Sequence, residues 1–122
     1  MNHKELGNSG ENTACLFLES KGYSIIEKNY RADRKEIDII AQKDGCIIFA
    51  EVKTRSSASY GIPSESVGIT KQKHIILSAK KFLHDNGRLY SGLQPRFDII
   101  EIYRDKKTGK NYVRHLEGAF IT

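Results

Sequence analysis

The sequence lacks any hydrophobic run long enough to cross a membrane as a helix, which takes about 18 apolar residues. Its first residues, 1–5, are polar and do not form the hydrophobic core of a signal peptide. Only two cysteines occur, Cys15 and Cys46, and their spacing matches no metal motif or disulfide framework. We therefore expect a soluble cytoplasmic protein without a membrane partner, whose cysteines are free thiols.

The chain also lacks repeats, low-complexity tracts and obvious linkers. Its 122 residues can build one sizeable hydrophobic core, so we expect a single domain over residues 1–122. Periodicity and turn residues predict a helix over 8–21, strands over 23–30, 36–43 and 46–54, a loop over 55–69, a helix over 70–86, and strands over 96–104 and 111–116. This order predicts an α/β fold with a mixed sheet flanked by helices.

The dipeptide Asp44-Gly45 is a strong turn signal. Asp-Gly favours a two-residue type I′ hairpin, because both central residues need positive φ. In such a hairpin the numbers of opposed residues sum to 89, so Asp38 lies opposite Glu51, with Cβ atoms roughly 5 Å apart. The same register places Glu36 opposite Lys53 on this polar face.

The other face of the hairpin is expected to be wholly apolar and to pack against a helix or the core. Its opposed pairs are Ile37 with Val52, Ile39 with Ala50, and Ala41 with Ile48.

Two carboxylates placed this close repel each other unless a cation lies between them or one is protonated. Oxygen ligands at this spacing suit Mg²⁺ or Mn²⁺, and neither strand supplies the His or Cys cluster that Zn²⁺ prefers. Lys53 points the same way as Glu51 and is placed to stabilise charge that builds on a phosphate under attack. A solvated strand face with alternating charges and a Glu36–Lys53 pair explains the hairpin equally well.

Positive charge is concentrated in one third of the chain. Residues 53–88 hold seven basic and two acidic residues, which accounts for the whole net charge of +5. A basic segment directly downstream of the two acids suits a polyanion, most simply nucleic acid, bound through its phosphates. A solvated basic surface without a partner is the alternative.

Each predicted helix carries a polar residue on its apolar stripe. With successive residues about 100° apart, Glu11 shares its stripe with apolar residues and faces the sheet, although capping-box spacing with Asn8 explains this acid too. In the second helix Gln72 falls on the apolar stripe. The Gln72 side chain either points toward the carboxylate site, with Lys71 beside it, or is a buried amide that hydrogen-bonds the backbone.

In this order of elements, the chain resembles the PD-(D/E)xK nuclease superfamily. The matching residues are Glu11, Glu36-Ile-Asp38, the segment 49–55 that contains Glu51-Val-Lys53, and Lys71-Gln72. More narrowly, the chain resembles the bacterial YraN-like family, akin to archaeal Holliday junction resolvases, over nearly its whole length. Lys35 stands where that family usually has glycine, so the turn into this strand is expected to differ.

The resemblance implies a restriction endonuclease-like αβββαβ core and a Mg²⁺- or Mn²⁺-dependent endonuclease that hydrolyses phosphodiester bonds in DNA. Structured or branched DNA in repair or recombination is the implied substrate, and a homodimer is plausible because resolvases act as dimers. A nucleic-acid-binding protein that keeps the fold without catalysis is the alternative.

The resemblance also implies roles for individual residues. Asp38 and Glu51 would hold the metal together with the main-chain carbonyl of Val52, and Lys53 would assist the attacking water. Glu11 would support this metal or a second one, and Gln72 would take an accessory position. Six basic residues are expected to hold the flanking phosphates: Arg31, Arg34, Lys35, Arg55, Lys71 and Lys73.

Overall fold

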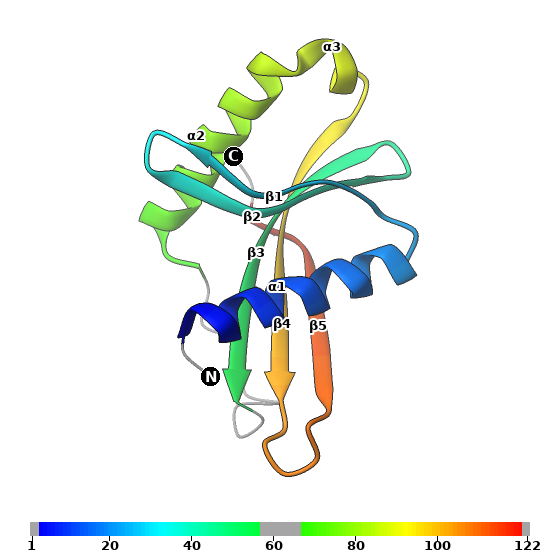
Figure 1. Ribbon diagram of the computed structural model, residues 1–122. Helices are drawn as coiled ribbons and strands as arrows, with labels where there is room; N and C mark the ends of the chain where they lie inside the picture. Colours follow the sequence, from blue (N-terminus) through cyan, green and yellow to red (C-terminus); the bar gives the residue numbers. More distant parts are fainter. Residues whose placement is uncertain (1–2, 57–66, 121–122) are drawn as a thin grey trace.

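The computed structural model describes residues 3–56 and 67–120 (Figure 1). Its elements are α1 (His3–Ser20), β1 (Ser24–Ala32), β2 (Lys35–Lys43), β3 (Cys46–Ser56), α2 (Ile69–Asp85), α3 (Gly87–Tyr90), β4 (Gln94–Arg104) and β5 (Asn111–Phe120). The strands form a five-stranded sheet in the order β1-β2-β3-β4-β5, in which β3 and β4 are parallel and the other neighbours antiparallel. This confirms the predicted mixed sheet flanked by helices.

Several boundaries differ from the prediction; β1 and β5 end two and four residues later than predicted, and β4 begins two residues earlier. Helix α1 begins at His3, because the residues before Asn8 include strong helix formers, so Asn8 lies inside the helix and is not its N-cap. Gly87, predicted to end the second helix, instead begins the short helix α3. The first two residues of the predicted loop belong to β3, and its residues 57–66 lie outside the described part of the chain.

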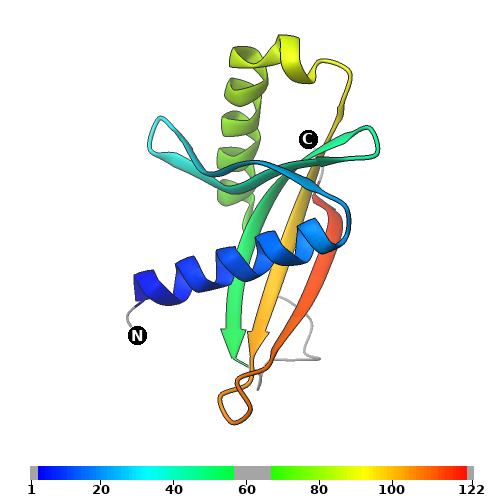
Figure 2. The ribbon, with the colours of Figure 1, turned by 45° about the vertical axis from the view of Figure 1, so that its right-hand side comes forward.

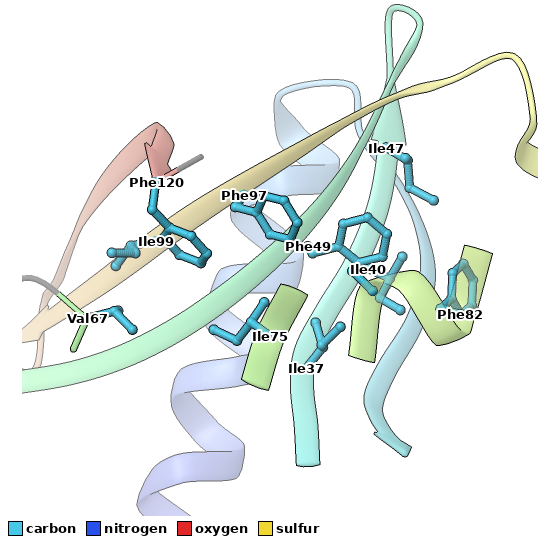
Figure 3. Close-up of a cluster of buried hydrophobic side chains, with 11 residues drawn as sticks. Ile37, Ile40, Ile47, Phe49, Val67, Ile75, Phe82, Phe97, Ile99 and Phe120 are labelled. Atoms are coloured by element: carbon cyan, nitrogen blue, oxygen red, sulfur yellow. The ribbon is translucent and has the colours of Figure 1, made fainter. Parts of the chain in front are cut away.

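The two long helices cover opposite faces of the sheet (Figures 1 and 2). Buried residues on the α1 side form a cluster made of Ala14, Cys15, Leu18, Tyr23, Ile39, Ala41, Ile48, Ala50, Ile100 and Ile102. The cluster on the α2 side, which Figure 3 shows, contains Ile37, Ile40, Ile47, Phe49, Val67, Ile75, Ala79, Phe82, Phe97, Ile99 and Phe120. Burying apolar surface on both faces stabilises the layered arrangement.

No helix within the described ranges has both the length and the apolar character to cross a membrane.

The predicted hairpin between β2 and β3 is confirmed. Asp44 and Gly45 have φ of 49° and 81°, both positive as a type I′ turn requires. The register pairs Ile40 with Phe49, and its last pair is Ile39 with Ala50. Beyond that pair the two strands diverge, and β2 crosses the direction of β3 (Figure 1).

The predicted apolar pair Ile37–Val52 is wrong. Ile37 packs in the α2-side cluster, whereas Val52 packs against the α1-side cluster. The alternation of faces changes between Ile37 and Ile39, which lie in different clusters, and opposite this point on β1 Asn29 has a φ of 55°, outside the range of a regular strand. The change places Asp38 on the side of the sheet that carries α1.

Candidate metal centre

Three carboxylates converge where β2 leaves β3. Glu11 comes from α1, and Glu36 and Asp38 come from β2. One carboxylate oxygen from each lies within 4.8 Å of the other two, and this is the one such group of three in the described part of the chain. The three side chains are only partly exposed. Together they offer the hard oxygen ligands that Mg²⁺ and Mn²⁺ prefer.

Asp38 links this group to a fourth acid, Glu51 of β3. The main-chain N–H of Val52 donates to Asp38 Oδ2 at 2.8 Å and holds the carboxylate where the two strands diverge. The Asp38 carboxylate also meets the carboxyl of Glu51 at hydrogen-bonding range. The two acids of the predicted hairpin are therefore brought together, although they lie beyond the last paired residues.

Nearby positive charges compensate the acids only in part. Burial, and next the Asp38 carboxylate, raise the pKa of Glu51 to about 7. Burial also raises the pKa of Asp38 and that of Glu11, where the Asp38 charge adds to the effect. The Glu51 side chain is only 15% exposed, and its Oε2 has no hydrogen-bond partner among the described residues. Such a donor set fits a divalent cation, which would relieve the repulsion and use the buried oxygen.

Three basic residues border the carboxylates. Lys71 Nζ at the start of α2 lies 3.8 Å from Glu51 Oε2. The charge of Lys53 acts on Glu51 and partly opposes the rise of its pKa. Arg31 Nη2 lies 3.8 Å from Glu36 Oε2, with 78% of its side chain exposed.

The other predicted site residues have different surroundings. Arg34 lies in the exposed β1–β2 turn with φ of 65°, and Lys73 is exposed on α2. Lys35 is partly buried at the start of β2. Arg55 donates to Glu101 at 3.1 Å. The Gln72 side chain donates to the main-chain carbonyl of Val67 at 2.7 Å, which realises the backbone-bound alternative.

Two contributors were not predicted. Glu36 was expected opposite Lys53, but it lies with the other acids. The two-residue spacing from Asp38 was its signal, because alternate residues of a strand share a face. Asn29 hydrogen-bonds the Glu11 side chain. Its only sequence signal is weak: asparagine adopts positive φ more readily than most residues, but a single asparagine within a strand pattern does not show that it does so.

Gly10 lets α1 approach β3 next to this site. A Cβ at this position would collide with the Thr54 side chain. We expect Gly10→Ala to lower the free energy of unfolding by about 1 kcal/mol, because overpacking costs about 1–3 kcal/mol and better helix propensity returns only about 1. It should also weaken Mn²⁺ binding by displacing Glu11. Urea unfolding and Mn²⁺ titration check this; Gly87→Ala, whose Cβ would meet nothing within 4 Å, is the control and should lose neither.

The fold and the site define an α/β protein in which a helix and two diverging strands bring four partly buried acids together. The chain belongs to the family described as Uncharacterised protein family UPF0102, whose profile matches residues 10–102. This region contains all four acids.

Relatives named UPF0102 protein match almost end to end. One from Clostridium perfringens is 47% identical over 118 residues, covering 97% of this chain and 95% of the relative. One from Caldicellulosiruptor bescii is 44% identical over 124 residues, covering 98% and 100%. One from Flavobacterium psychrophilum is 40% identical over 118 residues, covering 97% and 95%.

Proposed function

We propose that this protein is a Mg²⁺- or Mn²⁺-dependent endonuclease with a restriction endonuclease-like core, which hydrolyses phosphodiester bonds in DNA. The observation that carries the proposal is the meeting of Asp38 with Glu51 at the opening between β2 and β3, with Glu11 and Glu36 within ligand distance of Asp38. Structural charge pairs do not account for this arrangement, because within the described residues four acids meet but only two of them, Glu36 and Glu51, form ion pairs.

Asp38 and Glu51, with the main-chain carbonyl of Val52, would hold the cation, and Glu11 and Glu36 would complete or extend the ligand set. When bound, the cation polarises a phosphate oxygen and activates water for attack. Ionised Glu51 is the form that binds it, since metal ligands must lose their proton.

Basic residues around the acids supply the other functions of a nuclease. Lys53 lies two residues beyond Glu51 on β3 and would stabilise the charge that develops on the phosphate. Lys71 keeps a positive charge 3.8 Å from Glu51 and favours its ionised form. Arg31, Arg34, Lys35 and Lys73 would hold flanking phosphates. Binding through the backbone favours recognition of DNA shape, such as branched DNA in repair or recombination, over recognition of sequence.

Lys53→Met tests this assignment, because methionine keeps the length and apolar stem of lysine but removes the charge. The parent is expected to cleave labelled branched, duplex or single-stranded DNA when Mg²⁺ or Mn²⁺ is added. The variant should cleave about 100- to 1,000-fold more slowly, the usual cost of losing one group that stabilises transition-state charge. Its Mn²⁺ affinity should stay within about twofold of the parent, because Lys53 is not a ligand.

Matched assays on RNA distinguish the class of nucleic acid. A parent protein that binds DNA and Mn²⁺ but leaves every substrate intact would contradict the nuclease and favour a non-catalytic binding protein. Light scattering with and without DNA separately tests the homodimer that the resemblance to resolvases implies.

A further inference from the structure

A second charged cluster lies beside the candidate metal centre. Glu101 of β4 is fully buried. It is in register with Lys53 on β3 and with Arg114 on β5, so the three residues form a row across the sheet. Neighbouring strands lie about 4.8 Å apart, and Lys53 follows Glu51 by one strand repeat. The row is therefore adjacent to the acids that would hold the metal.

Two guanidinium groups bind the two oxygens of Glu101. Arg55 Nε lies 3.1 Å from Oε2, and Arg114 Nε lies 3.0 Å from Oε1. Arg114 Nη2 also donates to the hydroxyl of the buried Tyr103 at 2.6 Å. The buried carboxylate thus fixes both arginines, so that a ligand would not have to order these long side chains on binding.

Among the described residues, the cluster holds the three positive charges of Lys53, Arg55 and Arg114 and the one negative charge of Glu101. Glu101 balances one of the two arginines, and Lys53 adds a third positive charge in the same row. Arg55 and Arg114 keep 23% and 32% of their side chains exposed, so both reach the surface. Arg55 Nη2 is buried without a hydrogen-bond partner among the residues described. Two partly exposed guanidinium groups held in place by a buried carboxylate suit an external anion, and the planar guanidinium group matches the oxygens of a phosphate.

We propose that Arg55 and Arg114, positioned by Glu101, bind a backbone phosphate of the substrate next to the phosphate that lies at the metal centre. The inference rests on the proposed function for the nature of the substrate. Lys53 lies on β3 between Glu51 of the metal centre and Arg55 of the arginine pair, so the cleaved phosphate and the phosphate bound by the arginines would lie on either side of it. The substrate is then a polynucleotide that continues at least one nucleotide beyond the cleaved bond, and isolated nucleotides or terminal phosphates alone are poor substrates.

The test is a salt titration of DNA binding by Arg114→Gln. Ca²⁺, another cation that takes oxygen ligands, occupies the acids, and the probe is a fluorescently labelled DNA duplex or single strand. Loss of one phosphate contact should weaken binding about five- to tenfold near 0.1 M salt and make the slope of log K against log salt shallower by about 1. Arg114→Lys should recover the salt slope of the parent, because lysine restores the positive charge, although it lacks the paired N–H donors of the guanidinium group. Arg88→Gln, an exposed residue of α3, is the matched control and should resemble the parent.

Folding and catalysis are followed separately. Arg114→Gln should stay folded but melt at a lower temperature than the parent, because Arg55 still neutralises the buried Glu101 while one charged contact to it is lost; binding is therefore measured well below the melting temperature of the variant. If the parent binds DNA and Arg114→Gln binds with the affinity and salt slope of Arg88→Gln, the phosphate contact is wrong and the metal centre is unaffected. If the predicted loss occurs but the parent never cleaves, the contact stands and the nuclease proposal fails. A parent that binds no DNA overturns both.

Discussion

Asp38→Asn is expected to abolish Mn²⁺ binding and to reduce DNA cleavage by at least about 1,000-fold, since the cation contributes several kcal/mol and each 1.4 kcal/mol is about tenfold. Asp38 is the one acid that contacts both groups of ligands, Glu11 with Glu36 on one side and Glu51 on the other. Its loss therefore divides the site. Isothermal titration with Mn²⁺ and a gel assay of labelled DNA measure the two effects.

The same variant should fold normally, which separates loss of metal from loss of structure. The asparagine oxygen can still accept the Val52 N–H, and removing one of two repelling charges relieves Glu51. We expect the metal-free variant to be about 1 kcal/mol more stable than the parent at pH 8, where both acids of the parent are ionised. Its urea midpoint should not respond to Mn²⁺.

Asp44→Asn is the control for this experiment. It makes the same chemical change in the exposed turn that joins β2 to β3, and asparagine also accepts the positive φ of that position. It should bind Mn²⁺ and cleave DNA like the parent. An Asp38→Asn protein that binds Mn²⁺ as tightly as Asp44→Asn would show that the site has been assigned to the wrong residues.

Local chemistry made much of this site predictable. The Asp44-Gly45 turn fixes the register of its hairpin as far as Ile39 and Ala50, so counting from the turn places Asp38 and Glu51 one residue beyond the last pair, where the strands diverge. The stripe on α1 likewise placed Glu11 toward the sheet, because helical periodicity is decided within the helix.

What could not be predicted depends on contacts between distant segments. The break in alternation at Asp38, opposite the positive φ of Asn29, goes together with the separation of Ile37 from Val52 and with the place of Glu36 in the carboxylate group. The cluster around Glu101 needs β3, β4 and β5 together, and its register across the parallel pair is set by packing and not by a turn. Sequence periodicity carries no information on either feature.

The stability of the metal-free protein should fall as the pH rises from about 5 to about 8. Glu51 has a pKa raised from 4.5 to about 7, and the pKa of its partner Asp38 is raised as well. Between these values the folded protein binds more protons than the unfolded chain, so raising the pH favours unfolding. A pKa shift of this size lowers the free energy of unfolding by about 2–3 kcal/mol at pH 8 relative to pH 5. Because Asp38 and Glu51 titrate as a coupled pair, the change belongs to both residues.

Glu51→Gln should flatten this dependence, because it removes the group with the largest shift and one charge of the repelling pair. At pH 8 the metal-free variant should be more stable than the parent by about 2 kcal/mol, and at pH 5 the two should agree within about 0.5 kcal/mol. Urea unfolding at several pH values measures both curves, and their difference isolates this residue from other titrating groups. Glu27→Gln, an exposed acid on β1, should follow the parent curve.

Saturating Mn²⁺ should reverse the trend in the parent, since the cation binds the ionised acids more tightly as the pH rises. At about 100 times its dissociation constant it adds about 2.7 kcal/mol, enough to offset the repulsion at pH 8. Glu51→Gln should gain little from the metal at any pH. A parent whose stability rises with pH in EDTA would mean that Asp38 and Glu51 do not compete for one proton, and the buried pair would then have no need of a cation.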